Sequence, residues 1–353
     1  MMPAPPLPTL SATWPNLHGQ TILVRANFDV PLSQGKVIDT TRILAHRETL
    51  KLLLNQGCSF RLLAHQGRPN GTYQPQASLQ PLIPVLTEML SVTVGLAPYS
   101  ANFSQTTLPP TPVVLIENLR FWPGEAANQP DFCHWLASLG QFYINEAFAN
   151  CHRAHASIVG LPQLLPAAAG LTLANEVKTL DQVLHQPAKP LVMVIGGAKL
   201  ETKLPLVEAF STTADTILVG GKIAVELASH TTLPPQVQLA QLELHQKDIT
   251  LASAQAFAQI IHTAGTVIWN GTMGMFEDPR YRQGTQLIAQ AVNTTPAFTL
   301  VGGGDTETAL TELKLEAGID HISTGGGAML AYLIQGTLPG IQALLTAKTY
   351  AKS

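Results

Sequence analysis

The feature that most constrains this chain is the alternation of short, continuously apolar runs with longer stretches of helical spacing. Runs rich in β-branched residues recur at Thr21–Val24, Phe60–Ala64, Val113–Ile116, Phe142–Ile144, Val192–Ile195, Thr216–Val219, Val267–Trp269 and Phe298–Val301. Segments with helical spacing lie between them, including Thr40–Leu53, Glu201–Phe210, Ala254–Ile261 and Thr306–Leu313. Apolar strands that alternate with helices are typical of parallel sheets covered on both faces. The pattern therefore predicts an α/β fold.

Two arrangements suit this pattern in a chain of 353 residues: a (β/α)₈ barrel and a pair of doubly wound domains. The segment Leu171–Pro190 favours the second, because its spacing predicts an amphipathic helix that two prolines close near the middle of the chain. We therefore expect two doubly wound parallel-sheet domains joined by an interdomain helix.

The composition excludes several classes of protein. Charged residues make up only 12% of the chain and hydrophobic residues 46%, which excludes a disordered chain. The net charge of −3 argues against a general nucleic-acid binder, which needs a broad basic surface. The chain has no apolar run of the ~20 residues that cross a bilayer and no signal peptide. Cys58, Cys133 and Cys151 form no paired motif, so we expect buried thiols and a cytoplasmic location.

In the first half of the chain, cationic side chains follow the predicted strands. Five arginines and two or three histidines stand after a strand or at the start of the next helix: Arg25, Arg42, Arg68, Arg120 and Arg153, with His65, His152 and, as the third, His155. The carboxyl ends of parallel strands meet at one sheet edge, so we expect these side chains to gather there. Guanidinium groups bind both phosphate and carboxylate. This half therefore predicts a pocket for a small anionic substrate.

In the second half, the predicted strands end in glycine-rich turns, at 196–197, 220–221, 271–274, 302–304 and 325–327. Glycine permits close backbone approach, and a strand-to-helix turn directs N–H groups and the helix dipole at an anion. Asp305 has the oxygen chemistry that Mg²⁺ prefers when it also binds nucleotide phosphates. The chain has neither a P-loop motif nor a GxGxxG fingerprint. An arginine pocket in one domain and a phosphate cradle in the other indicate phosphoryl transfer, completed by domain closure.

Several strings together resemble the phosphoglycerate kinase family, over nearly the whole chain from about Leu17 to Leu345. They are LVRANFDVPL, IDTTRI, HQGRP, ENLRF, NEAFANCHRAHAS, GGAKLETK, VIWNGTMGMFE, GGGDTETA and HISTGGGAMLAYL, followed by LPG at 338–340. They occur in the order of the family. The resemblance implies reversible phosphoryl transfer between 1,3-bisphosphoglycerate with MgADP and 3-phosphoglycerate with MgATP.

The resemblance also implies a role for each matching residue. Arg42 and Lys199 would hold the moving phosphoryl group from two sides, and the turn Gly325, Gly326 and Gly327 would present N–H groups to it. The substrate-binding residues would be Arg25, Asn27, Asp29, His65, Arg68, Arg120, His152 and Arg153. The nucleotide-binding residues would be Gly196, Gly197, Lys203, Gly220, Gly221, Asn270, Glu277, Gly302, Gly303, Gly304 and Thr306, with Glu277 on the ribose. Asp305 would bind Mg²⁺.

For the fold, the resemblance implies two Rossmann-like domains. Residues 1–174 would bind phosphoglycerate, and residues 175–337, including the hinge helix, would bind ATP or ADP. The segment 338–353 would return to the first domain. The family further implies a monomer whose partners are small molecules, with no nucleic acid and no membrane.

The chain departs from the family pattern at four places. The usual Arg-x-Asp-x-Asn reads Arg25-Ala26-Asn27-Phe28-Asp29, so acid and amide have exchanged positions. Thr272 replaces a usual proline, and Lys222 replaces a small or apolar residue, either as a solvated side chain or as a nucleotide contact. The region between Gly221 and Thr266 is shortened, and it walls the nucleobase pocket in the family.

Two other functions stay open on the sequence alone. A noncatalytic binding protein with this fold would account for the exchanged Asn27 and Asp29 and for the shortened nucleotide wall. A phosphotransferase for another small acid would also account for the exchange. A nicotinamide dehydrogenase is disfavoured, because the dinucleotide fingerprint is missing.

Overall fold

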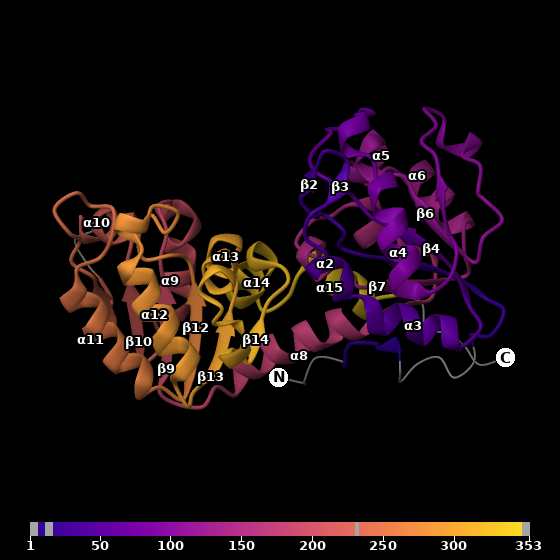
Figure 1. The fold of residues 1–353 in the computed structure, drawn as a ribbon. Helices are drawn as coiled ribbons and strands as arrows, with labels where there is room; N and C mark the ends of the chain where they lie inside the picture. The colour runs from indigo at the N-terminus through magenta and orange to yellow at the C-terminus, as the bar shows by residue number, and fades with distance from the viewer. Residues whose placement is uncertain (1–5, 11–16, 230–232, 348–353) are drawn as a thin grey trace. The chain divides into compact units, whose positions relative to one another are not determined.

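The computed structural model describes residues 6–10, 17–229 and 233–347. The chain divides into two compact units (Figure 1). Unit 1 comprises the described residues of Met1–Val177 and Thr337–Ser353, and unit 2 comprises those of Lys178–Gly336. Each unit contains one six-stranded sheet in which every strand pair is parallel. This confirms the predicted α/β fold with two parallel-sheet domains; the last residues of the expected returning segment, 348–353, lie outside the described residues.

The sheet of unit 1 has the strand order β5-β6-β4-β1-β7-β8. Its strands are β1 (Thr21–Arg25), β4 (Ser59–Leu63), β5 (Val94–Ala97), β6 (Val113–Ile116), β7 (Phe142–Asn145) and β8 (Ala167–Ala169). Val24 in β1 lies opposite Leu62 on one side and Ile144 on the other. A short antiparallel hairpin, β2 (Leu32–Ser33) and β3 (Lys36–Val37), follows β1.

Helices cover both faces of this sheet (Figure 1). They are α2 (Thr41–Leu44), α3 (Arg47–Asn55), α4 (Ile83–Leu90), α5 (Pro123–Ala126), α6 (Pro130–Ser138), α7 (Leu161–Leu164) and α15 (Pro339–Leu345). Ile22 and Val24 pack in one core cluster with Leu50 and Leu53 of α3. Leu23 lies between them in sequence and is also fully buried, so it points to the opposite face. Burial on both faces explains why the strands are apolar without alternation.

The sheet of unit 2 has the order β11-β10-β9-β12-β13-β14. Its strands are β9 (Leu191–Ile195), β10 (Thr216–Val219), β11 (Val237–Leu239), β12 (Thr266–Asn270), β13 (Phe298–Val301) and β14 (His321–Ile322). Numbered along the unit, this is the order 3-2-1-4-5-6 of a Rossmann fold, in which the chain reverses direction between β9 and β12. Ligands bind at such a reversal, beyond the carboxyl ends of the strands.

The helices of unit 2 form two packed groups. They are α9 (Leu204–Phe210), α10 (Lys222–Ala228), α11 (Leu251–His262), α12 (Gln283–Thr294), α13 (Gly304–Leu313) and α14 (Gly326–Gln335). Helix α11 packs against α12, and α9 packs against α14. Phe257 of α11 and Ile288 of α12 share a core cluster with Trp269 of β12, which is fully buried.

Helix α8 (Leu171–His185) begins in unit 1 and ends in unit 2, two residues before Pro187. Its first turn is capped by the buried carboxylate of Glu146, which accepts hydrogen bonds from Leu173 N (3.1 Å), Thr172 N and Thr49 Oγ1. Thr49 Oγ1 in turn accepts from Leu171 N at 3.0 Å. The start of α8 is thus fixed to β7 and α3 by one side chain.

The secondary structure differs from the sequence prediction in two respects: one predicted helix is broken, and each sheet has two additional strands. The predicted helix Thr40–Leu53 is wrong as one element, because it is broken into α2 and α3. His46, at the break, is buried and accepts a hydrogen bond from Asn27 N through Nε2 (3.1 Å). The other unexpected elements are the four outer strands of the two sheets: β5, β8, β11 and β14.

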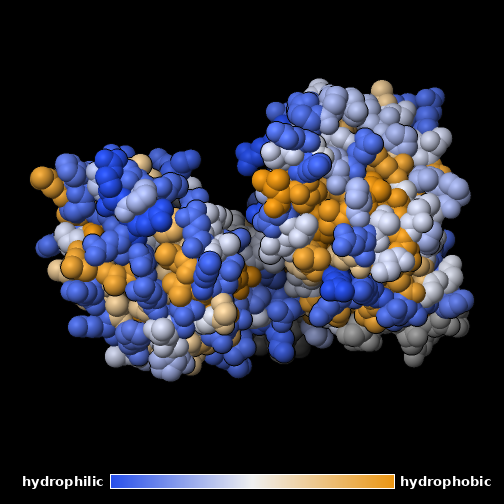
Figure 2. All heavy atoms as spheres, in the orientation of Figure 1, coloured by the Kyte–Doolittle hydropathy of each residue, from blue (hydrophilic) through white to orange (hydrophobic). Residues whose placement is uncertain are grey.

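The surface of the described residues mixes hydrophobic and hydrophilic side chains on the face drawn in Figure 2. Within the described ranges, no single helix has both the length and the apolar character to span a membrane.

Replacement of Glu146 by Gln tests the cap of α8. Burial raises the pKa of Glu146 to about 6 from an ordinary value of 4.5, although its hydrogen bonds act in the opposite direction. The folded chain therefore binds this proton more tightly than the unfolded chain, and stability present below pH 4.5 is lost as the pH rises through 6. We expect the unfolding free energy of the wild type to fall by about 2 kcal/mol relative to Glu146→Gln between pH 4.5 and 7.

Urea unfolding at a series of pH values measures this difference. Glu48→Gln, on the exposed side of α3, is the matched control and should leave the pH profile of the wild type unchanged. If the unfolding free energies of the wild type and Glu146→Gln depended on pH in the same way, the raised pKa of Glu146 would be contradicted.

Candidate active site

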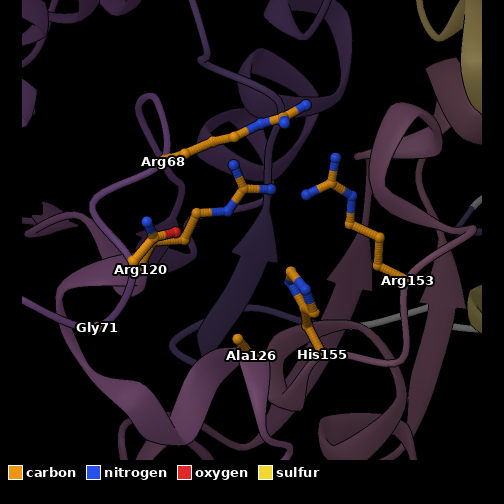
Figure 3. Close-up of a pocket in the computed structure, with 7 residues that line it drawn as sticks. Arg68, Gly71, Arg120, Ala126, Arg153 and His155 are labelled. Carbon is orange, nitrogen blue, oxygen red and sulfur yellow. The ribbon is translucent and has the colours of Figure 1, made fainter.

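Three arginines converge on a cavity of about 250 Å³ in unit 1 (Figure 3). Arg68 follows β4, Arg120 lies in a short helical turn after β6, and Arg153 follows β7, so three strands of one sheet edge deliver them. Asn70, Gly71, Ala126 and His155 complete the lining. In Figure 3, the guanidinium groups of Arg68, Arg120 and Arg153 point toward one another, with no carboxylate among the residues that line the cavity.

Arg120 shows that this cavity is suited to an anion. Its Nη1 donates to Gly67 O at 2.7 Å, but its buried Nη2 has no hydrogen-bond partner among the described residues. Burial, followed by the charges of Arg153 and Arg25, lowers the pKa of Arg120 to about 10. A buried donor without a partner and clustered positive charge are both relieved by an anion that accepts hydrogen bonds.

A second layer of polar side chains lies behind the arginines. His65 Nδ1 accepts a hydrogen bond from Arg25 Nη2 (3.1 Å), and its Nε2 lies 3.6 Å from Asp29 Oδ2. Burial would raise the pKa of Asp29, but the hydrogen bonds from His65 and Gly67 N outweigh burial and hold it well below its usual range. Burial lowers the pKa of His65 to about 3 despite the Asp29 carboxylate. Asp29 is thus ionised and His65 neutral near pH 7.

Arg25 is fully buried at the end of β1 and belongs to the same layer. Its Nε donates to Ser157 Oγ at 2.8 Å, and Ser157 donates through N (3.0 Å) and Oγ (2.5 Å) to the buried carboxylate of Glu125. His155 Nδ1 lies 3.7 Å from the same carboxylate. Hydrogen bonds therefore link Arg25 to Ser157 and Glu125, and Glu125 lies beside His155 of the cavity lining.

The exchanged acid and amide occupy different environments. The carboxylate of Asp29 accepts from Gly67 N at 2.9 Å and faces His65, and its backbone carbonyl accepts from Arg42 Nη1 at 2.6 Å. Asn27 is buried, and its backbone N donates to His46. The exchange thus places the carboxylate, rather than the amide, beside His65 and next to Arg42.

In unit 2, the site is built from backbone. Gly196 N donates to Asn270 O and Gly197 N to Thr272 O, both at 2.9 Å, which joins the turns after β9 and β12. Gly221, after β10, has φ +68°, and a Cβ there would lie 2.7 Å from Gly197 O. Only glycine fits this position, because both the conformation and the contact exclude a side chain. Gly220 precedes Gly221 in the turn after β10, and Gly303 lies in the turn after β13, where a Cβ would lie 2.8 Å from Asn270 Nδ2.

Polar side chains join this backbone near the start of α13. Lys203 Nζ donates to the side-chain oxygen of Asn270, whose Nδ2 donates to Gly302 O. Thr306 Oγ1 accepts from Gly271 N at 2.8 Å. Burial lowers the pKa of Lys203 to about 8, and the carboxylate of Asp305 opposes this effect. Lys203 and Asp305 therefore lie close enough to interact.

A cavity of about 400 Å³ crosses the carboxyl edge of this sheet. Its lining includes the predicted residues Gly197, Gly221, Glu277 and Asp305, and also Thr272 and Lys222. Lys222 Nζ lies 3.8 Å from Glu226 Oε1, and its side chain is 66% exposed. The side chain of Lys222 is therefore exposed to solvent, and it also lines the cavity, so both alternatives raised for Lys222 from the sequence are compatible with its position.

The remaining predicted residues lie at helix starts or on the surface. Gly325, Gly326 and Gly327 begin α14, and a Cβ on Gly326 would lie 2.5 Å from Gly303 Cα, so this turn packs against the turn before α13. Gly304 begins α13. Lys199 is exposed after β9, and Arg42 is half-buried in α2. His152 accepts a hydrogen bond from Arg153 Nε at 3.2 Å.

The donor set near Asp305 suits a metal that a nucleotide brings with it. The described part of the chain holds no cluster of three or more His, Cys, Asp or Glu residues that would form an all-protein metal site. Asp305 supplies one exposed carboxylate beside Lys203 and the N-terminus of α13. One carboxylate, with nucleotide phosphates and water, is the coordination that Mg²⁺ usually has in kinases.

Sequence reasoning did not assign several residues that line the two cavities. The sequence places His155 among the basic side chains without a role, and Asn70 lies two positions beyond a predicted arginine, which is a signal that could have found it. Gln246 and Lys247 line the cavity of unit 2 from a loop outside the family-matching strings, and Met275 lines it from within VIWNGTMGMFE. They are brought there by the backbone bond between Met275 N and Lys247 O (2.7 Å).

The comparisons with known proteins agree with this geometry. The family model described as phosphoglycerate kinase matches residues 13–234 and 229–336. A phosphoglycerate kinase of Moorella thermoacetica is 35% identical over an alignment of 381 residues, gaps included, that covers 93% of this chain and 97% of the relative. One of Thermus thermophilus is 36% identical over 380 residues, covering 92% and 97%.

Solved structures give the same result. The structure of phosphoglycerate kinase from Coxiella burnetii superposes with a TM-score of 0.85 at 30% identity and covers 97% of this chain and 100% of its own. Phosphoglycerate kinase from Pyrococcus horikoshii has a TM-score of 0.79 at 26% identity, covering 93% and 96%.

Proposed function

This chain belongs to the phosphoglycerate kinase family, and from that premise we propose which of its residues transfer the phosphoryl group to a carboxyl group. As a phosphoglycerate kinase, it is a transferase of glycolysis whose substrates are a phosphoglycerate and a nucleotide. The observation that supports the residue roles most strongly is the cationic cavity of unit 1, with its unpartnered Arg120 Nη2.

The acid substrate is held by the arginine cavity. Arg68, Arg120 and Arg153 bind its phosphate, and Arg120 Nη2 gains the acceptor that it lacks. Asp29 and His65 border the position of the glycerate hydroxyl, where an ionised carboxylate accepts a hydrogen bond. Arg25 acts by holding His65 and Ser157 in place, because its guanidinium is fully buried.

The nucleotide is held by the cavity of unit 2. Lys203 and the N-terminus of α13 bind its phosphates, and Glu277 accepts hydrogen bonds from the ribose. Asp305 would hold Mg²⁺ together with those phosphates. When bound, Mg²⁺ would neutralise the charge that develops on the phosphate oxygens.

Transfer itself needs no nucleophilic side chain, because the carboxylate of the acid and the nucleotide supply both reacting oxygens. The chain supplies position and positive charge. Arg42, Lys199 and the N–H groups at the start of α14 stabilise the charge on the moving group. Since the two ligands bind to separate units, we propose that the units close about α8 before transfer.

No observation favours a noncatalytic relative or a different acid. The cationic, phosphate-binding and metal-binding groups are all present, and the exchange of Asn27 and Asp29 still leaves one amide and one carboxylate. We further propose a monomer in the cytoplasm. The three cysteines are free and buried, and burial raises the thiol pKa of Cys133 to about 11 and that of Cys151 to about 12, which suits inert thiols in a reducing compartment.

Replacement of Arg42 by Ala tests the proposed transfer. If Arg42 stabilises only the moving phosphoryl group, kcat falls by about 10²–10³-fold while the dissociation constant of the nucleotide stays unchanged. A rate assay with 3-phosphoglycerate, together with nucleotide titration, measures both quantities. Arg47→Ala, five positions on and exposed, is the control that retains full activity. Weakened nucleotide binding with unchanged kcat would assign Arg42 a different role.

Replacement of Asp305 by Asn tests the metal site through binding alone. The wild type should bind ATP more tightly with Mg²⁺ than without it, and Asp305→Asn should weaken binding of MgATP by about tenfold. Binding of metal-free ATP should stay equal or strengthen, because a carboxylate no longer repels the phosphates. Glu312→Gln, two turns later on α13, is the control. An unaltered Mg²⁺ dependence in Asp305→Asn would refute the assignment.

A further inference from the structure

The cavity of unit 2 runs across the sheet from one side to the other. Asp305 lines it from the first turn of α13, which follows β13, Glu277 from the loop after β12, and Gly197 from the loop after β9. Lys222 lines it after β10, and Gln246 and Lys247 line it from the loop after β11. Neighbouring strands are ~4.8 Å apart, so β13 and β10, three strand intervals apart, separate the two ends by roughly 14 Å.

One end of this cavity is built for phosphates. Asp305, in the first turn of α13, lines this end, and Lys203 lies close enough to Asp305 to interact with its carboxylate. A nucleotide whose phosphates occupy this end extends toward β10 and β11, and its ribose passes Glu277. Its base therefore reaches Lys222, Gln246 and Lys247 at the opposite end.

The base end is lined by hydrogen-bond donors. Lys222 Nζ is 3.8 Å from Glu226 Oε1, which is longer than a hydrogen bond, and Lys247 Nζ stands 5.1 Å from the ring centroid of Tyr281. Both ammonium groups thus retain donors for a ligand, and an ammonium group cannot accept. Gln246 offers one donor and one acceptor group and does not discriminate.

Purine bases differ in the edge that they present to such donors. Adenine carries an acceptor at N7 beside a donor, the 6-amino group, whereas a 6-oxopurine carries two adjacent acceptors, N7 and O6. An amine facing the 6-amino group leaves two donors opposed, while an amine facing O6 forms a charge-assisted hydrogen bond.

Resting on the proposed function, we propose that Lys222 and Lys247 make this site selective for 6-oxopurine nucleotides, guanine or hypoxanthine, over adenine nucleotides. Met275, half-exposed in the same cavity, packs against the base without discriminating between purines. The two lysines are specificity residues and take no part in the transfer.

The test compares kcat/KM for ATP, GTP and ITP with saturating 3-phosphoglycerate, detecting 1,3-bisphosphoglycerate so that the readout does not depend on the nucleotide. GTP and ITP should be used about tenfold more efficiently than ATP, since one such contact discriminates by at least 1 kcal/mol. ITP isolates the 6-oxo group from the 2-amino group of guanine. Lys222→Met and Lys247→Met should each reduce the preference, because each variant loses a donor to O6 and lowers kcat/KM for GTP and ITP.

Lys36→Met, on the exposed β2–β3 hairpin of unit 1, is the matched control and should retain the wild-type preference. A wild type that prefers ATP to both other nucleotides, or a preference that neither lysine variant alters, would overturn the inference. If no nucleotide supports turnover, the proposed function fails instead. Titration of ADP, GDP and IDP then decides the inference separately, with the same tenfold difference expected in their dissociation constants.

Discussion

Parallel strands that are buried on both faces bring all their carboxyl ends to one edge, and the candidate active site depends on this constraint. Helices cover both faces of each sheet, so only the ends of its strands remain accessible to a ligand. The loops that follow the strands therefore form the binding surface. Chain segments distant in sequence, such as those after β4, β6 and β7, thereby place Arg68, Arg120 and Arg153 around one cavity. The candidate functional residues of both units therefore gather at this edge.

The two units use the same edge in opposite ways. Unit 1 withdraws charged side chains from water: Arg25 and His65 are buried, and Asp29 is held ionised by its hydrogen bonds. In unit 2, glycines let the backbones of neighbouring turns approach closely, as Gly196 does where the turn after β9 meets the end of β12. Backbone N–H groups at the starts of α13 and α14 remain available as donors. Desolvated arginines suit a small, rigid anion, whereas backbone donors at helix starts suit a longer, phosphate-bearing ligand.

The sequence predicted the inner strands of the two sheets better than the outer strands. Every predicted run became one of the four inner strands of a sheet, where apolar residues are covered on both faces. The outer strands gave weaker signals: Ala167–Ala169 is buried but only three residues long, and His321–Ile322 has two partly buried residues. The break at His46 and the burial of Arg25 depend on tertiary contacts, which periodicity does not contain. Gln246 and Lys247 reach their cavity through a long-range backbone bond and were therefore missed.

The central claim is that the two units transfer a phosphoryl group by position and charge alone, with Lys199 among the groups that hold it. The most direct measurement is the rate of 1,3-bisphosphoglycerate formation from 3-phosphoglycerate and nucleoside triphosphate, for the wild type and for Lys199→Ala. The account predicts turnover in the wild type, a loss of about 10²–10³-fold in the variant, and unchanged stability, because Lys199 is exposed. Binding of both ligands to the wild type without turnover would contradict it.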